Sequence, residues 1–473
     1  MACMSILFIA CSSSSDDNGD DNGKTGGTLS ETITQRSCSL QEGVEVSAEE
    51  VTSITVTYNT TVKVSANAKI TLNGTTLTAK SSASTKMAIE IPVTLDEGTN
   101  YTLTIPSGTV LAIADETRTA PTFTLNFSTA KPVETNPGNI DALCDASATD
   151  AAKNLYNLLL QNYGKKMFSS VIADVNWNHK IADQIYQKTG KYPAFNCYDF
   201  IQIYVPSGNG WINYDDITPV TEWADAGGLV QLMWHFNVPL SQTTTVGKDG
   251  SGVTCTPSET TFRASNALKD GTWENKWFYQ EMDKVIAVLQ KLQDKNIAAV
   301  WRPFHEAAGN ATLKSGASWG KSWFWWGYDG AEVYKNLWKT MYSYFQQKGI
   351  HNLIWVWTTQ NYNGDSTTYN ADTDWYPGNE YVDIIGRDLY GNTAAQNKTE
   401  FEQIAARYPN KMVALAECGS NGNTAFANMS DVWSGGAKWA WFMPWYGSSL
   451  PTDTWWKNAM SNANVLTRSD ISK

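Results

Sequence analysis

Two glutamates follow apolar stretches of the chain in a way that suits acid–base chemistry. Glu306 ends the stretch AAVWRPFHE, and Glu417 ends the stretch KMVALAE. An apolar run that passes into charged and imidazole side chains is typical of a buried parallel strand whose carboxyl end opens into a site. Two carboxyl groups at one opening can divide glycoside hydrolysis between them. One protonates the leaving oxygen, and the other attacks the anomeric carbon or activates water. Glu306 and Glu417 are therefore the candidate catalytic residues.

Residues 143–473 hold the elements that must position these glutamates. Apolar runs alternate there with helical patterns, two of which are clear at 277–295 and 329–349. The predicted strands are 167–175, 193–200, 228–236, 297–304, 352–358, 381–390, 412–417 and 439–446. These repeats predict an α/β fold, a (β/α)8 TIM barrel, in which Glu306 follows the fourth strand and Glu417 ends the seventh. A doubly wound open sheet is the alternative. It is disfavoured because no glycine-rich phosphate loop follows the first predicted strand.

The composition is that of a folded, acidic and aromatic-rich protein. Of 473 residues, 42% are apolar and 17% are charged, and the net charge is −12. A negative chain repels phosphate backbones, so the composition argues against nucleic acid as a partner. The 21 Trp and 21 Tyr residues can cover the flat faces of sugar rings, or they can build a large aromatic core. No Cys or His spacing suggests a zinc site, so we expect no metal. We also expect no cofactor and a monomeric protein.

Residues 29–130 have a different pattern from the rest of the chain. Segments such as SITVTYNTTVKV alternate apolar and polar residues, and Gly, Asn and Pro interrupt them at short intervals. This pattern predicts a small antiparallel β-sandwich, and the segment resembles bacterial Ig-like domains. We expect it to act as a spacer rather than as a sugar-binding module. The proline-bearing stretch 131–142 is expected to be a linker.

The first residues resemble a localisation signal. MSILFIAC, residues 4–11, is an apolar run too short to span a bilayer, and it resembles the end of a secretory signal peptide with a lipobox at Cys11. The acidic stretch 12–28 is disordered by composition and resembles the tether of Bacteroidetes surface lipoproteins. We therefore expect a partial signal peptide over 1–11, a lipid on Cys11 as the only membrane attachment, and an outer-membrane or cell-surface location. A buried apolar element followed by a flexible linker is the alternative.

Short segments near the predicted strand ends resemble glycoside hydrolase family 26, a clan-A retaining (β/α)8 family known mainly for β-1,4-mannanases. In family order they are MWHFNVP (233–239), WRPFHE (301–306), SWFWWG (322–327), WYPGNEYVDIIGRDLY (375–390), ALAECG (414–419) and WFMPWYG (441–447). The resemblance covers essentially all of 143–473. It implies a retaining endo-acting hydrolase of β-1,4-mannosidic bonds in mannan, glucomannan or galactomannan, with the polysaccharide as its partner.

The resemblance also implies roles for single residues. By position, Glu306 matches the general acid/base and Glu417 the nucleophile. His305 matches a histidine that contacts the sugar and positions the nucleophile, and Tyr390 matches a tyrosine that hydrogen-bonds the nucleophile. Asp388 matches a polar contact near that tyrosine.

Further positions match substrate contacts. His235 matches a sugar-binding histidine, Trp323 an aromatic side chain of the −1/+1 region, and Trp445 a tryptophan that forms the floor of the −1 subsite. We expect at least one of Trp325 and Trp326 to serve packing.

Several of these residues also have a structural interpretation. His305 and His235 could be core histidines with ordinary packing roles. Asp388 could equally be a structural partner of Arg302 or Arg387.

The chain departs from the family in two places. The segment 307–327 is longer than the usual link between the acid/base and the tryptophan motif, which adds a loop beside the site. Tyr446 stands where many mannanases have an arginine that contacts sugar in the −2 subsite. Xylan and mixed-linkage β-glucan therefore remain alternative substrates. An alternative of another class is a non-catalytic glycan-binding surface lipoprotein, which the intact Glu306 and Glu417 disfavour.

Overall fold

The computed structural model describes residues 32–46, 48, 51–82, 86–129, 139–173, 177–206, 212–315, 321–362 and 367–471. The chain forms two compact units, one up to Pro132 and one from Val133 onward. The predicted signal peptide, the lipidation site at Cys11 and the tether 12–28 lie outside the described residues, as does most of the linker 131–142.

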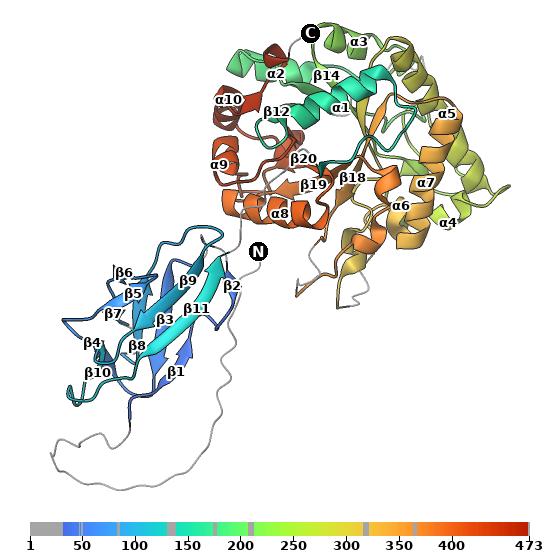
Figure 1. Cartoon of the computed structure of the whole chain (residues 1–473). Coiled ribbons are helices and arrows are strands. Elements are labelled where there is room, and N and C mark those ends of the chain that lie inside the picture. Colours follow the sequence, from blue (N-terminus) through green and yellow to red (C-terminus); the bar gives the residue numbers. More distant parts are fainter. Residues whose placement is uncertain are drawn as a thin grey trace. The chain divides into compact units, whose positions relative to one another are not determined.

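The described part of the N-terminal unit consists of strands (Figure 1). They are β1 (Gln35–Cys38), β2 (Glu45–Val46), β3 (Ser53–Tyr58), β4 (Val62–Val64), β5 (Ile70–Leu72), β6 (Thr75–Leu77), β7 (Lys80–Ser81), β8 (Ala88–Pro92), β9 (Asn100–Ile105), β10 (Val110–Ala112) and β11 (Phe123–Thr129). One sheet has the order β1-β3-β8-β7, the other β2-β11-β9-β5-β6, and β10 pairs with β4. The period-2 alternation buries Ile54 and Val56 of one sheet in the same cluster as Leu103 and Phe127 of the other.

The predicted β-sandwich is therefore confirmed, with one departure from antiparallel pairing. The two-residue strand β2 runs parallel to β11 at the edge of its sheet. The Ig-like assignment of this unit remains a prediction.

The C-terminal unit is the predicted (β/α)8 barrel (Figure 1). Its eight strands are β12 (Met167–Ile172), β13 (Phe195–Asp199), β14 (Leu229–Trp234), β17 (Ala299–Pro303), β18 (Leu353–Thr359), β19 (Ile384–Tyr390), β20 (Met412–Gly419) and β21 (Trp441–Pro444). Neighbours pair in parallel in this order, and β12 pairs with both β21 and β13, which closes the ring. Short strands β15 (Val238–Pro239) and β16 (Val253–Thr254) form a hairpin-like pair, and β22 (Val465–Leu466) lies beside β12.

Helices surround the barrel strands. They are α1 (Asp150–Asn162), α2 (Lys180–Thr189), α3 (Thr218–Asp225), α4 (Ala264–Ala267), α5 (Trp273–Asp294), α6 (Trp325–Tyr328), α7 (Ala331–Gln347), α8 (Ala394–Arg407), α9 (Met429–Ser434) and α10 (Asp453–Ser461). The helix predicted at 277–295 begins earlier because the Thr272 side chain caps it, accepting from the backbone N–H of Asn275. Among the described helices, none is long and apolar enough to cross a membrane.

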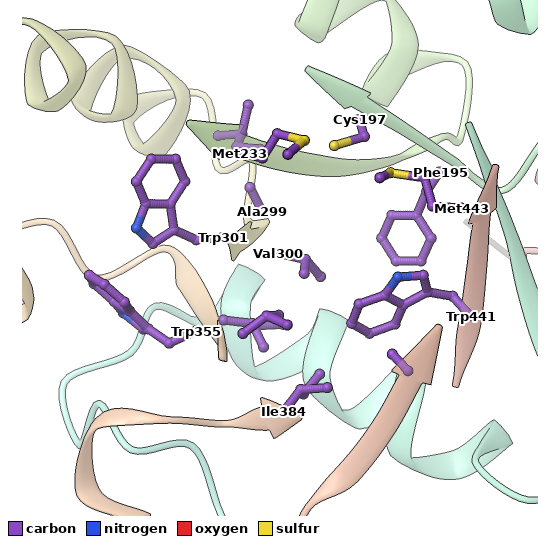
Figure 2. Close-up of a cluster of buried hydrophobic side chains, with 14 of the residues drawn as sticks. Phe195, Cys197, Met233, Ala299, Val300, Trp301, Trp355, Ile384, Trp441 and Met443 are labelled. Atoms are coloured by element: carbon purple, nitrogen blue, oxygen red, sulfur yellow. The ribbon is translucent and has the colours of Figure 1, made fainter. Parts of the chain in front are cut away.

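The barrel interior is packed with side chains, so a site can lie only at its mouth. Figure 2 shows the cluster, which includes Phe195 from β13, Met233 from β14, Val300 from β17 and Trp441 from β21. The rings of Phe195 and Trp441 lie against each other with centroids 6.1 Å apart. Because these strands are buried on both faces, they are largely apolar, and their charged residues collect toward their carboxyl ends.

Candidate active site

Glu417 reaches the barrel mouth through a bulge in β20. The register pairs Arg387 with Leu415 and Asp388 with Glu417, so Ala416 is an extra residue in β20. Ala416 lines the barrel interior beside Arg302, and the next side chain, Glu417, also contacts Arg302. A bulge can turn consecutive side chains toward one face, which simple alternation forbids. The bulge thus aims the Glu417 carboxylate inward.

Both carboxylate oxygens of Glu417 are held by side chains. Arg302 Nη1 donates to Oε1 at 2.6 Å, and the Tyr390 hydroxyl donates to Oε2 at 2.7 Å. Burial raises the pKa of the Tyr390 hydroxyl, and the negative Glu417 raises it further, so the tyrosine keeps its proton and remains a donor. These two bonds fix the position and orientation of a buried carboxylate, as a nucleophile requires.

Arg302 is the centre of this charged group. Its guanidinium donates to Asp388 Oδ2 as well as to Glu417, and its Nε donates to Thr358 Oγ1 at 2.9 Å. The structure pairs Asp388 with Arg302, whereas Arg387 points to Glu400, with Nε 2.7 Å from Oε2. Of the two structural partners predicted for Asp388, Arg302 is therefore the one it contacts.

The pKa of Asp388 is raised to about 7 by its environment. Burial is the largest cause, the positive Arg302 opposes it, and the nearby negative Glu417 adds to the rise. Two carboxyl groups thus share one guanidinium, and when both are ionised the group as a whole carries an excess of negative charge beside Glu306.

Glu306 lies just beyond β17 in a strained turn. The φ angle is 47° at Phe304 and 51° at Glu306, a left-handed conformation that costs a residue with a side chain roughly 1–2 kcal/mol. Such strain persists where neighbours over-determine the backbone. Here the Tyr334 hydroxyl donates to the carbonyl of Phe304 at 3.3 Å, and Trp326 Nε1 donates to the carbonyl of His305 at 2.9 Å.

The environment of Glu306 favours its protonated form. Burial raises its pKa well above the usual value, the negative Asp388 and Glu417 raise it further, and Arg302 opposes the change. A carboxyl group with a raised pKa beside an ionised partner is the arrangement that separates an acid from a nucleophile.

The two predicted histidines lie together beside the glutamates. The rings of His235 and His305 meet at a centroid distance of 4.4 Å and an angle of 75°. His235 is bound twice by Asp199: its backbone N–H donates to Oδ1 at 3.0 Å, and its Nδ1 lies 2.5 Å from Oδ2. Burial works against a charge on His235, but Asp199 outweighs it and raises the pKa. His305 is fully enclosed, and burial lowers its pKa well below the usual value.

The predicted aromatic residues fall into two groups. Trp445 packs against His235 at a centroid distance of 5.7 Å, and Trp323 is 45% exposed. Trp325 and Trp326 are fully buried, so both serve packing. Trp325 Nε1 donates to the carbonyl of Phe236 at 2.6 Å, which ties α6 to the end of β14. An exposed indole is free to stack on a sugar ring, and an enclosed one is not.

The long segment after Glu306 is closed at its base. The backbone N–H of Asn310 donates to the carbonyl of Lys321 at 3.1 Å. A Cβ on Gly309 would lie 2.8 Å from the backbone nitrogen of Trp323, so only glycine allows the two ends to meet so closely. Residues 316–320 of this segment lie outside the described part of the chain.

The structure thus brings Glu306, Glu417, Tyr390, Asp388, His235, His305 and Trp445 to one end of the barrel and places Trp323 on the loop beside Glu306. Sequence reasoning missed Asp199, which ends β13 in the stretch NCYDF and is 6% exposed. An acidic residue at a strand end is a usable signal, since it is the same signal that pointed to Glu417. Among the described residues, no cluster of His, Cys, Asp and Glu side chains is able to hold a metal ion.

The arrangement can transfer a proton and form a covalent bond at one centre. One carboxyl group accepts hydrogen bonds from two side-chain donors, and the other is biased toward its acid form. A hydrogen-bonded carboxylate beside a carboxyl group that favours its acid form fits acid-assisted nucleophilic substitution.

Comparisons with known proteins agree with this chemistry. The family model described as glycosyl hydrolase family 26 matches residues 144–470. The mannan endo-1,4-beta-mannosidase of Thermothelomyces thermophilus is 29% identical over 340 residues, which cover 70% of this chain and 63% of that protein. Mannan endo-1,4-beta-mannosidase A of a Piromyces species is 30% identical over 327 residues, covering 67% of this chain and 47% of that protein. The chain thus matches about half to two thirds of the length of these relatives.

Two solved structures give a fuller match. The GH26 domain of an endo-beta-mannanase/endo-beta-glucanase from Prevotella bryantii is 63% identical with a TM-score of 0.69, covering 70% of this chain and 99% of that one. A ruminal GH26 endo-beta-1,4-mannanase is 25% identical with a TM-score of 0.62, covering 89% of this chain and 90% of that one. The chain is therefore similar to mannanases in both sequence and fold.

Proposed function

The chain belongs to glycosyl hydrolase family 26, and from this premise we propose that it is a retaining endo-β-1,4-mannanase that cleaves mannan, glucomannan and galactomannan. The observation that supports the proposal most is the contrast between the two glutamates. Glu417 accepts hydrogen bonds from Arg302 and Tyr390, while the pKa of Glu306 is raised by burial and by the negative charges of Asp388 and Glu417.

The proposed reaction is a double displacement. Glu306 donates its proton to the glycosidic oxygen while a Glu417 carboxylate oxygen attacks the anomeric carbon, so the leaving sugar departs with a new hydroxyl group. The glycosyl group is then an ester of Glu417. Glu306, now ionised, takes a proton from water, the water oxygen attacks the anomeric carbon, and the Glu417 carboxylate is released.

The aromatic and histidine residues serve binding in this proposal. Trp445 forms the floor of the subsite next to His235, His305 and His235 contact the sugar held there, and the exposed Trp323 stacks on a sugar near the cleaved bond. Tyr390 keeps Glu417 in position. Relatives in this family are named for activity on mannan, and one solved relative was bound to a gluco-manno-oligosaccharide.

A side-by-side assay tests the substrate. Purified protein is incubated with glucomannan, galactomannan, xylan and mixed-linkage β-glucan, and released reducing ends are measured. We expect the two mannans to be cleaved fastest, into a range of oligosaccharides. A preference for xylan or mixed-linkage glucan would fit Tyr446 in place of a sugar-binding arginine and would replace mannan as the substrate. Binding without release of reducing ends would point instead to a glycan-binding protein.

Proton NMR of the first products tests the stereochemistry. A retaining enzyme releases the β-anomer first, which then mutarotates, whereas immediate α-anomer excludes the double displacement.

We propose further that the protein is a lipoprotein anchored through Cys11 at the outer membrane or cell surface, as a monomer with an Ig-like spacer. The support is the apolar run MSILFIAC followed by the acidic stretch 12–28. Metabolic labelling with a fatty acid, compared between the native chain and Cys11→Ser, tests the anchor; label on both chains would refute it.

A further inference from the structure

The turn that carries Glu306 is held at both ends, and its far end is held by the residues just past β18. After Glu306 the backbone passes through Ala307 and Ala308 to Gly309, whose φ angle is 47°. The backbone N–H of Gly309 donates to Oε1 of Gln360, and the carbonyl of Gly309 accepts from Nδ2 of Asn361 at 3.3 Å. Both polar groups of one peptide residue are thus bound by consecutive side chains just past β18.

Gln360 is itself fixed from two directions. Its backbone N–H donates to Oδ2 of Asp372 at 2.6 Å, and its carbonyl accepts from Nη1 of Arg387 at 2.5 Å. Asp372 is 1% exposed and also accepts from the Thr359 hydroxyl at 2.8 Å. Arg387 is in turn ion-paired with Glu400. The Gln360 side chain, 8% exposed, therefore projects from a backbone that cannot shift easily.

The same pair of loops is joined a few residues further on. Asn361 Nδ2 donates to Thr312 Oγ1 at 2.6 Å, and the backbone N–H of Asn370 donates to the carbonyl of Thr312 at 2.8 Å. Leu313 and Tyr369 form an antiparallel bridge. The loop after the acid/base is thus bonded along its first half to the loop after β18.

We infer that Gln360 is a positioning residue for Glu306, which acts through the backbone of Gly309 to fix the turn that aims the acid/base at the glycosidic oxygen. This inference rests on the proposed function, since it assigns Gln360 a part in the proton-transfer half of that reaction. Tyr334 and Trp326 hold the turn before Glu306, and Gln360 holds it after Glu306. Loss of the Gln360 bond leaves the strained φ angles of the turn supported from one side only.

The experiment compares two substrates that differ in their need for a proton. Cleavage of mannopentaose needs an acid, because a sugar alkoxide is a poor leaving group. The 2,4-dinitrophenyl β-mannobioside releases a stable phenolate without protonation, so its kcat/KM reports the attack of Glu417. A misplaced Glu306 lowers kcat/KM for the first substrate and spares it for the second, whereas a damaged fold or subsite lowers both.

The test variant is Gln360→Met, which keeps the side-chain length and lacks the acceptor. We expect kcat/KM for mannopentaose to fall about 10- to 100-fold, a large part of what general acid catalysis contributes, and kcat/KM for the aryl substrate to stay within about twofold. The kcat for the aryl substrate is expected to fall and to recover with azide, which attacks the glycosyl-enzyme without losing a proton. Gln360→Glu, which still offers an oxygen to Gly309, is expected to keep the native ratio of the two kcat/KM values.

Gln293→Met is the matched control. Gln293 also accepts a backbone N–H, that of His351 at 2.8 Å, but it does so before the start of β18, at the other end of that strand. We expect this variant to keep both kcat/KM values.

The outcomes separate cleanly. The positioning role is overturned if Gln360→Met loses kcat/KM equally on both substrates, or on neither. It is also overturned if Gln360→Glu behaves like Gln360→Met. If Gln360→Met does not fold, Gln360→Asn, whose shorter side chain retracts the acceptor, gives the same comparison. Native protein without activity on either substrate refutes the proposed function before any variant is compared.

Discussion

The imidazole rings of His235 and His305 lie 4.4 Å apart, yet their surroundings shift their pKa values in opposite directions. Burial lowers the pKa of His305, and the positive charges near it, on His235 and Arg302, lower it further. Burial also disfavours a charge on His235, but the carboxylate of Asp199 overcomes that effect and raises the pKa. When the pair carries one positive charge, His235 therefore bears it, and His305 stays neutral beside the glutamates.

Asp199→Asn is expected to lower the pKa of His235 and to weaken activity. The variant keeps an oxygen for the backbone N–H of His235 but loses the charge, and a hydrogen bond to a charged group contributes about 1.5 kcal/mol, or roughly tenfold in kcat/KM. NMR titration of the imidazole and assays on mannan measure the two effects. Asp145→Asn is the matched control. Asp145 Oδ2 lies 2.8 Å from His351 Nδ1, and this pair is remote from the candidate site, so we expect the control variant to keep its activity. An unchanged His235 titration in Asp199→Asn would contradict the assigned cause.

The ion pair between His235 and Asp199 makes the stability of the protein depend on pH. Because the pKa of folded His235 is raised, the ion pair with Asp199 contributes fully below the pKa of an unfolded histidine and is lost as pH rises through the folded pKa. The free energy of unfolding of the native protein should therefore decrease over that interval more than that of Asp199→Asn. Chemical denaturation at a series of pH values measures the difference; parallel curves for the two proteins would refute it.

Asp388→Asn is expected to move the alkaline limit of activity toward lower pH. Glu306 must be protonated to act as an acid, and after burial the negative charge of Asp388 is the largest cause of its raised pKa. Removing that charge lowers the pKa of Glu306, so the acid form is lost earlier as pH rises. The pH profile of kcat/KM on mannan shows the shift. If the alkaline side of the pH profile stays in place or moves to higher pH, Glu306 is not the titrating acid.

Glu417→Gln is expected to abolish hydrolysis while the fold persists. The amide cannot attack the anomeric carbon, so kcat should fall by at least about three orders of magnitude. Arg302 keeps Asp388 as an ionic partner and Thr358 as a hydrogen-bond partner, so the buried guanidinium is not left alone. Reducing-sugar release and thermal unfolding measure activity and fold. Glu417→Ala provides a second test, and residual turnover near the native level in either variant would falsify the nucleophile assignment.

Gly327→Ala is expected to destabilise the turn that follows Glu306. A Cβ at this position would lie 1.9 Å from the carbonyl oxygen of Ala307 and 2.3 Å from the Ser322 hydroxyl. Relief of such a clash moves Ala307, the neighbour of Glu306, and overpacking of this kind costs about 1–3 kcal/mol. Denaturant unfolding should show the loss, and activity on mannan should fall with it. A variant as stable and active as the native protein would show that Gly327 does not pack tightly against Ala307 and Ser322.

The barrel could be predicted because its strands are buried on both faces. IAAVWRPF and NLIWVWT are apolar runs of strand length, separated by helical patterns, and the structure has β17 and β18 there. The ends of helices were less predictable. Ala331–Gln347 is shorter than the predicted 329–349 because Gly330 and Gly349, with φ angles of 95° and 79°, bound it. The places of Glu306 and Glu417, just past β17 and near the end of β20, followed from the same strand pattern.

The details of the site depended on features that no residue pattern records. The extra residue Ala416 in β20 leaves no mark in the sequence ALAECG, and strict alternation would place Ala416 and Glu417 on opposite faces. Asp199 and His235 come from different strands, so their pairing arises only when β13 and β14 lie side by side. Trp323, Trp325 and Trp326 share one short motif, and only the fold separates the exposed ring from the enclosed ones.

The closed base of the segment after Glu306 has an evolutionary consequence. Because Asn310 bonds to Lys321 and Gly309 abuts Trp323, the turn that carries Glu306 and the exposed Trp323 are joined at the base of the segment. Residues 312–314 are bonded to the loop after β18, so they are not free to change. The entropy of closing a loop grows only slowly with its length, so residues between Lys314 and Lys321 can be added or lost at small entropic cost. Over evolution, this distal part of the segment can therefore vary in length while the turn that carries Glu306 and its supports stay unaltered.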